Sequence, residues 1–281
     1  MKHSRHILKF FSRLHGLSFL LLALTGSCLA EGMDWSLLKG DHFIVRYKTN
    51  EPFAREVLRA AEKYYQNVAS DLGYIRYANF WTWDNRVTIE IHPDQASFRQ
   101  ATRQPSWSVG YADYTLKSIS TFDGSSIFVQ SILPHEITHL VFRDFVGFKG
   151  EVPLWIDEGV SQWQEPDKRR IVRAYARRLV EQGQFFPLQD LTRTDIRDSL
   201  DQRRVQTFYI QAASLVEFMI ERFGAEAFTD FCRQLRDGKS LNESLKFSYS
   251  SRMRDLDELQ KEWIKYVMEA PVQGNPGVPS S

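Results

Sequence analysis

Cysteine is scarce in this sequence, which contains only Cys28 and Cys232 among its 281 residues. A chain cleaved beyond Cys28 would keep a single cysteine and could form no disulfide within itself. A hydrophobic core must then stabilise the fold, and about 250 residues suffice for one domain or for two closely packed halves. We expect Cys232 to pack as a small apolar side chain in a helix.

An excess of charge and a long apolar run are also missing. The chain has 36 Lys and Arg against 35 Asp and Glu, so no overall field favours nucleic acid or an anionic membrane as a partner. The apolar run at residues 17–24 is shorter than the roughly 20 residues that a membrane span needs. The sequence therefore predicts neither a nucleic-acid-binding protein nor an integral membrane protein.

The first 30 residues have the pattern of a signal peptide. A basic segment precedes the apolar run, and small residues follow it as far as Ala30. Two interpretations of this end remain open. Cleavage after Ala30 would release a soluble protein, which we favour, whereas lipidation of Cys28 would anchor it, although Thr25 stands where lipoprotein signals prefer Leu. Both interpretations predict an exported protein, either periplasmic or secreted.

His135, Glu136 and His139 form the pattern His-Glu-x-x-His. Histidines four residues apart on a helix lie on one face, where two neutral imidazoles can hold Zn²⁺ at about 2.0–2.1 Å each. Glu136 would lie beside the open position of the metal and could take a proton from the water that the metal activates. The alternative is an amphipathic helix whose histidines bind no metal.

A third ligand is expected in the apolar segment Leu154-Trp155-Ile156-Asp157-Glu158-Gly159. Catalytic zinc usually has three protein ligands, and eighteen residues separate Glu158 from His139. A charged side chain inside an apolar segment needs a partner, which a metal would provide. We therefore predict one Zn²⁺ per chain, held by His135, His139 and Glu158.

This combination of motifs resembles the gluzincin metallopeptidases of the peptidase MA superfamily. The ligand spacing is that of the aminopeptidase-N-like branch, and residues 41–268 are most similar to the short exported members of the superfamily. The metzincin pattern does not fit, because Phe142 and Phe145 stand where it requires Gly and His. The resemblance implies a peptide or protein substrate. It also implies that Tyr209, in the segment Tyr209-Ile210-Gln211-Ala212, donates a hydrogen bond to the developing oxyanion; without the resemblance, Tyr209 would be an ordinary half-buried helix residue.

Two departures from the family limit what the resemblance implies. No Gly-x-Met-Glu-Asn segment precedes the histidines, so aminopeptidase activity is unsupported. Thermolysin-like enzymes orient a histidine with an Asp four residues after the third ligand, but Gln162 occupies that position here. Asp157 is an alternative acceptor for a histidine, although the sequence does not show where it points.

The predicted fold is α+β, and the resemblance implies a zincin-like arrangement with the histidine-bearing helix between two parts. Residues 31–130 should form a small mixed sheet with helices, and residues 131–269 a mostly helical catalytic part. Residues 270–281 should be a disordered tail. Strands are expected at residues 41–47, 86–92, 109–114 and 126–130, and helices at 53–72, 94–102, 131–146, 153–164, 168–182 (capped by Asp167), 206–223, 225–236, 240–247 and 256–268.

Two surfaces of this fold have alternative interpretations. The resemblance implies that the last strand of the sheet borders the histidine-bearing helix and pairs with an extended substrate, but a scaffold sheet without substrate contact is equally consistent with the sequence. The basic residues of the 168–182 helix, which begin at Lys168, fit a solvated face better than a surface for acidic substrates.

Taken together, the motifs and the resemblance predict an exported zinc-dependent peptidase with Glu136 as the base and, as the resemblance implies, Tyr209 as the oxyanion donor. A competing hypothesis is a metal-containing envelope protein that binds or scaffolds a partner without turnover. A third is a zinc hydrolase that acts on a non-peptide amide. The sequence gives no cleavage preference and no oligomeric state.

Overall fold

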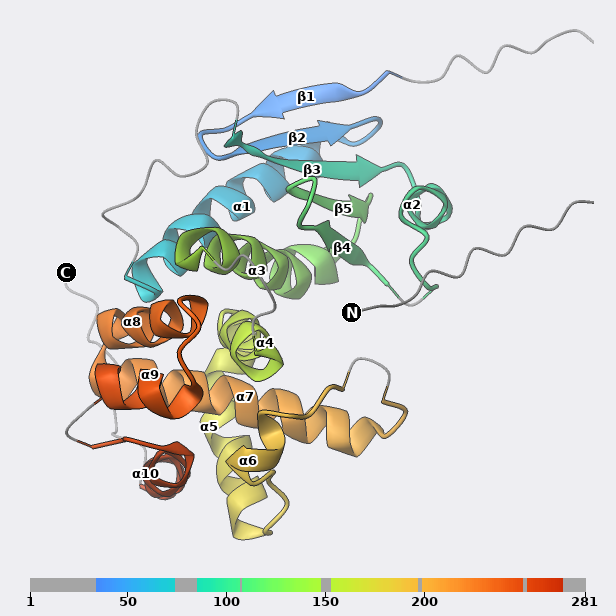
Figure 1. Cartoon of the computed structure of the whole chain (residues 1–281). Coiled ribbons are helices and arrows are strands. Elements are labelled where there is room, and N and C mark those ends of the chain that lie inside the picture. Colours follow the sequence, from blue (N-terminus) through green and yellow to red (C-terminus); the bar gives the residue numbers. More distant parts are fainter. Residues whose placement is uncertain are drawn as a thin grey trace, which may run out of the picture. The chain divides into compact units, whose positions relative to one another are not determined.

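The computed structural model describes residues 34–73, 85–106, 108–147, 153–196, 199–249 and 252–269, and within these residues five strands form one mixed sheet (Figure 1). The strands are β1 (Ser36–Lys39), β2 (Phe43–Tyr47), β3 (Val87–His92), β4 (Gly110–Asp113) and β5 (Ser118–Phe122), in the spatial order β1-β2-β3-β5-β4. Strands β2, β3 and β5 run parallel, whereas β1 and β4 pair antiparallel at the two ends. Strand β4 is therefore an edge strand.

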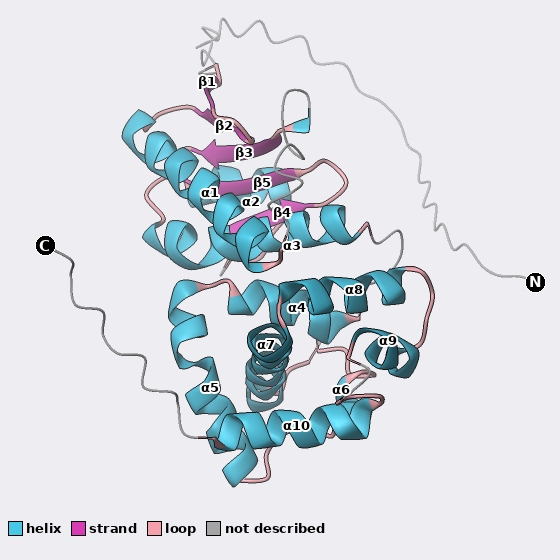
Figure 2. Ribbon diagram, turned by 90° about the vertical axis from the view of Figure 1, so that its left-hand side faces the viewer, coloured by secondary structure: helices cyan, strands magenta, loops and turns pink. Residues whose placement is uncertain are grey.

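The helices follow mostly in the second half of the chain. They are α1 (Glu51–Asp71), α2 (Gln95–Thr102), α3 (Leu133–Val146), α4 (Leu154–Trp163), α5 (Pro166–Glu181), α6 (Leu188–Leu191), α7 (Gln202–Phe223), α8 (Ala225–Arg236), α9 (Leu241–Ser248) and α10 (Leu256–Met268). Figures 1 and 2 both place α3 between the sheet and the helices from α4 onward. The structure thus confirms the predicted α+β fold and the position of the histidine-bearing helix.

Alternation of side chains gives the sheet its buried face. Phe43, Val45 and Tyr47 of β2 are buried, while the residues between them are partly exposed. Helix α1 packs against β2 and begins at Asn50, whose side chain accepts a hydrogen bond from the backbone N–H of Phe53. This cap supplies a partner for one of the free N–H groups of the first turn.

The strand predicted at residues 126–130 is wrong. Residues Phe128–Ile132 form a π-helical turn that continues into α3, and Phe128 and Val129 are buried there. A short apolar run does not distinguish a buried strand from a buried helical turn. The sheet instead gains β5, which was missed because its buried Ser120 and Thr121 obscure the apolar pattern.

Two helix starts also differ from the prediction. Helix α5 begins at Pro166 with Glu165 as the preceding cap residue, so Asp167 lies inside the first turn and is not the cap. Proline suits a first helical turn because its ring fixes φ and because an N–H at that position would have no partner within the helix. Helix α7 begins at Gln202, earlier than predicted, because the Asp201 side chain accepts hydrogen bonds from two backbone N–H groups.

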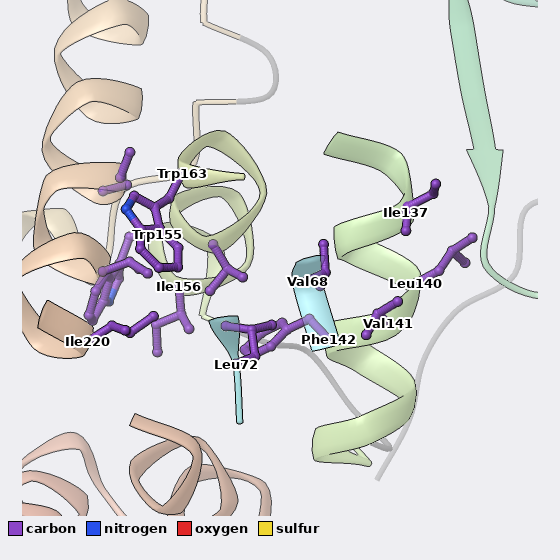
Figure 3. Close-up of a cluster of buried hydrophobic side chains, with 14 of the residues drawn as sticks. Val68, Leu72, Ile137, Leu140, Val141, Phe142, Trp155, Ile156, Trp163 and Ile220 are labelled. Atoms are coloured by element: carbon purple, nitrogen blue, oxygen red, sulfur yellow. The ribbon is translucent and has the colours of Figure 1, made fainter. Parts of the chain in front are cut away.

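An apolar core joins the helices that carry the candidate ligands (Figure 3). Phe142 points from α3 toward α4 and meets Leu72, which follows α1, whereas Ile137 points away from α4. Leu72 and Phe142 are fully buried, as is Ile156 on α4. Burying a side chain of this size stabilises a fold by about 1.5–3 kcal/mol, so the spacing of α3 and α4 is held by packing.

The ends of the chain lie outside the described residues. They include the predicted signal peptide at residues 1–30 with Cys28, and the predicted tail at residues 270–281. Among the helices that the structure describes, none has the length and apolar character to cross a membrane. Cys232 is fully buried in α8, as expected for a small apolar side chain.

Candidate metal centre

The two histidines of α3 lie one turn apart and face the same point. Their Nε2 atoms are 3.0 Å apart, and their rings are nearly perpendicular. His139 is buried and His135 is partly exposed. The predicted arrangement on one helix face is therefore present.

Glu158 reaches this point from α4. Its Oε2 atom lies 3.7 Å from His135 Nε2 and 3.9 Å from His139 Nε2. A tetrahedral ion at about 2.0–2.1 Å from each ligand atom would separate two of them by about 3.3 Å. The distances of 3.0, 3.7 and 3.9 Å lie on both sides of that value, so this set of donors fits such an ion after small shifts.

Gly159 allows α4 to approach α7 closely beside this ligand. A Cβ atom at position 159 would lie 2.6 Å from the carbonyl oxygen of Ala212 and 2.8 Å from its carbon. Real Cβ atoms do not come this close to backbone atoms, so a larger residue would push the helices apart. The glycine thus fixes the position of Glu158 relative to α7, the helix that carries Tyr209.

His139 is oriented by Asp157, the residue before the third ligand. Asp157 Oδ1 lies 2.9 Å from His139 Nδ1, and its Oδ2 accepts hydrogen bonds from Arg143 at 2.6 and 3.2 Å. The Arg143 guanidinium also lies over the ring of Tyr114, which contacts His139 edge-on. Burial would raise the pKa of Asp157, but His139 and Arg143 lower it to about 2, so the carboxylate stays charged.

His135 is oriented by Glu165, which the sequence analysis did not select. Glu165 Oε1 lies 3.0 Å from His135 Nδ1 and accepts a hydrogen bond from Lys168 at 2.6 Å. Glu165 follows the third ligand by seven residues and lies beyond the end of α4, just before α5. It takes the place of the Asp that is absent at position 162, and because α4 has ended, helical spacing from Glu158 could not have identified it.

Negative charge surrounds the two histidines. Burial lowers the pKa of His139, but the carboxylates of Asp157, Glu158 and Glu136 raise it to about 9. An environment that binds a proton this tightly also favours a metal cation, since both carry positive charge. Because both Nδ1 atoms face carboxylates, the Nε2 atoms are left as the ligand atoms.

A cleft of about 850 Å³ opens beside this centre. His135 and Glu136 line it from α3, Val109 and Gly110 line it where β4 begins, and Tyr209 lines it from α7. Burial and the negative charges of Glu158 and Glu165 raise the pKa of the Tyr209 hydroxyl. Tyr209 is thus a stable hydrogen-bond donor on the same cleft as Glu136.

The structure therefore brings together all five residues that the sequence predicted, namely His135, Glu136, His139, Glu158 and Tyr209. A comparison with known families gives one match. The family model described as Peptidase MA superfamily matches residues 81–269, which include all five. No curated protein matches the chain.

Proposed function

The chain belongs to the peptidase MA superfamily, and we propose from this that it is an exported zinc-dependent peptidase of the gluzincin type. The observation that carries the proposal is the group formed by His135, His139 and Glu158, with ligand atoms within 4.8 Å of one another beside an open cleft. Two imidazoles and one carboxylate are the donor set of one class of zinc peptidases, of which thermolysin is an example. Export is proposed from the signal-peptide pattern of residues 1–30, with a soluble form favoured over a lipid anchor at Cys28.

Zinc held by these three side chains would act as a Lewis acid that polarises the peptide carbonyl and lowers the pKa of a water molecule. Glu136 takes a proton from the attacking water on its carboxylate and passes it to the leaving amide nitrogen. Its side chain lines the cleft beside His135 and forms no ion pair with any residue that the structure describes. It is therefore free for proton transfer.

Tyr209 and β4 complete the proposed mechanism. The Tyr209 hydroxyl donates a hydrogen bond to the oxygen on which charge develops, and loss of such a donor typically costs about 2.7–4 kcal/mol. Strand β4 is an edge strand whose first residue, Gly110, lines the cleft. An edge strand can pair with an extended peptide, which would align the scissile bond.

The substitution Glu136→Gln tests the proposal most directly. We expect it to keep the zinc and to reduce peptide cleavage by about 10²–10⁴-fold, because it removes the base and no ligand. Elemental analysis should find about one zinc per chain in the wild type and much less in Glu158→Ala. Cleavage of a peptide library, with and without a chelator, measures turnover.

The outcomes separate the alternatives. Unchanged cleavage in Glu136→Gln would exclude Glu136 as the base. Absence of zinc from protein purified with zinc supplied would contradict the mechanism. Zinc binding without any cleavage would favour the competing hypothesis of a non-catalytic binding or scaffold protein.

A further inference from the structure

The cleft extends well beyond the candidate ligands along two helices. Lys168 and Tyr175 line it from α5, and Arg203, Gln206 and Ile210 line it from α7. These residues are spaced by three, four or seven positions, so on each helix they lie on one face. Helices α5 and α7 pack against each other and together form one wall of the cleft.

The charges on this wall are positive. Among the described residues that line the cleft, the acidic ones are Glu136 and Glu165, both at the metal centre, whereas the cationic ones are Lys168 and Arg203. Glu165 is already bonded to His135 and Lys168. Asp201 lines a neighbouring hollow, which Arg203 also borders. Its side chain is engaged there, because it accepts hydrogen bonds from the backbone N–H groups of Arg203 and Arg204.

Arg203 is the free cation of this wall. Lys168 is paired with Glu165 at 2.6 Å, but the exposed side chain of Arg203 has no ion pair with any residue in the described ranges. It lies in the first turn of α7, whose N-terminal N–H groups are capped by the Asp201 carboxylate. A guanidinium can bind a carboxylate through two parallel hydrogen bonds, so Arg203 suits an acidic side chain.

The distance from the proposed catalytic tyrosine sets which substrate residue Arg203 would meet. Arg203 precedes Tyr209 by six residues on α7, which corresponds to about 9 Å along the helix axis. An extended peptide advances about 3.3 Å per residue. Arg203 therefore lies within reach of a substrate side chain two or three residues from the scissile bond.

Apolar side chains line the same cleft as this cation. Ile171 and Tyr175 on α5 are exposed there, and Val205 and Ile210 of α7 line it as well. They offer an apolar surface to a substrate residue next to the acidic one.

We propose that the wall formed by α5 and α7 selects peptides that carry Asp or Glu beside a large apolar residue, with Arg203 as the specificity-determining residue. This inference rests on the proposed function, because it describes the substrate of the same cleft. It favours the interpretation that the sequence made the weaker one for the helix of Lys168, namely a surface for acidic substrates.

Charge reversal at Arg203 tests the inference against a matched control. Arg204→Glu changes net charge by the same amount in the same helical turn, but Arg204 lies over Phe186 and lines only the neighbouring hollow. A synthetic peptide library is cleaved by the wild type and both variants, and cleaved sequences are read by mass spectrometry. We expect Asp and Glu to be enriched within three residues of the scissile bond, and the enrichment to fall at least about fivefold in Arg203→Glu only.

A binding measurement keeps this inference distinct from the proposed function. Zinc-loaded Glu136→Gln protein is titrated with fluorescent peptides that differ only by Glu, Gln or Lys at the acidic position, and anisotropy is recorded. The inference is supported if the Glu peptide binds most tightly and if this preference is weakened by salt and by introducing Arg203→Glu into the Glu136→Gln protein. This result would count even where the wild type cleaves nothing. Equal binding of the three peptides overturns the inference, and so does an equal loss of preference in Arg204→Glu. Cleavage without a preference for acidic residues also overturns it but leaves the proposed peptidase function intact.

Discussion

Two buried carboxylic acids in the helical part of the chain differ in charge state, because one is ionised at neutral pH and the other is mainly neutral. Asp157 on α4 and Glu217 on α7 are both less than one tenth exposed. The Asp157 oxygens bond to His139 and Arg143, and the pKa of Asp157 is about 2. Burial and the nearby Glu221 raise the pKa of Glu217 to about 8 against the lowering effect of two arginines, and its Oε2 has no hydrogen-bond partner in the described part of the chain.

The difference shows that partners, more than burial, decide where this fold keeps charge. Burial alone disfavours the ionised form of both acids. At the metal centre a histidine and an arginine offset that penalty, so a fixed negative charge lies behind His139. At Glu217 the penalty is only partly offset, and the neutral form is favoured at neutral pH.

Asp157→Ala should have the largest effect. It leaves the half-buried Arg143 without its partner and the His139 ring without its acceptor, so we expect the free energy of unfolding to fall by about 3–5 kcal/mol. The affinity for zinc should fall by about 10–100-fold. Chemical denaturation and zinc titration measure the two effects.

Asp144→Ala is the matched control for this change. Asp144 also pairs with a cation, Lys117, but both side chains are partly exposed, and such pairs contribute only about 0–1 kcal/mol. Equal destabilisation by the two substitutions would contradict the assigned importance of Asp157.

Glu217→Gln should remove a pH dependence of stability. The pKa of Glu217 rises from 4.5 to about 8 on folding, so the folded protein holds this proton more tightly and stability is fully present below pH 4.5. It falls as the pH rises toward 8, on the order of a few kcal/mol for a single group. The stability of the variant should change less with pH over this window, and at pH 8 the variant should be more stable than the wild type.

Denaturation curves at several pH values measure this effect, with Glu226→Gln as the control because Glu226 is exposed on α8. A wild type and a Glu217→Gln variant with parallel pH profiles would show that Glu217 is ionised when folded.

Glu165→Gln should have the smallest effect on the fold and a clear one on the metal. The amide oxygen can still accept the bond from His135, and Lys168 can turn toward water because its side chain is 46% exposed. We expect the affinity for zinc to fall about tenfold and stability to change by less than about 1 kcal/mol. Competition with a chromophoric chelator measures the affinity, and Lys168→Met should stay within about twofold of the wild type. An unchanged affinity in Glu165→Gln would mean that His135 needs no such partner.

The sequence predicted the parts of the site that depend on local periodicity. His135 and His139 share a face because the helix repeat requires it, and Glu158 lies in an apolar helix that must pack toward the core. The partners of the histidines depend on tertiary placement: Glu165 acts from a turn between two helices, and Arg143 gains its role only because Asp157 faces it. Periodicity alone could not show either contact.

The same limit applies to the fold. The long helices and the strands at 41–47, 86–92 and 109–114 were predicted because their apolar patterns are regular. Strand β5 is identified only by its pairing with β3 and β4, since serine and threonine dominate it. Residues 126–130 are apolar and β-branched enough for a strand, yet their burial against α3 favours a helical turn.

The contact at Gly159 also limits how this scaffold can change. Main-chain atoms of α4 and α7 are in contact there. The distance between the helices that carry Glu158 and Tyr209 is therefore already the smallest that two backbones allow, and no substitution can reduce it. In a saturation library, glycine should be the only residue at position 159 that preserves full zinc binding. Changes in the size of substrate that the cleft accepts must then come from its other walls. Evolution or engineering of this protein would therefore act on α5 and the loop before β4.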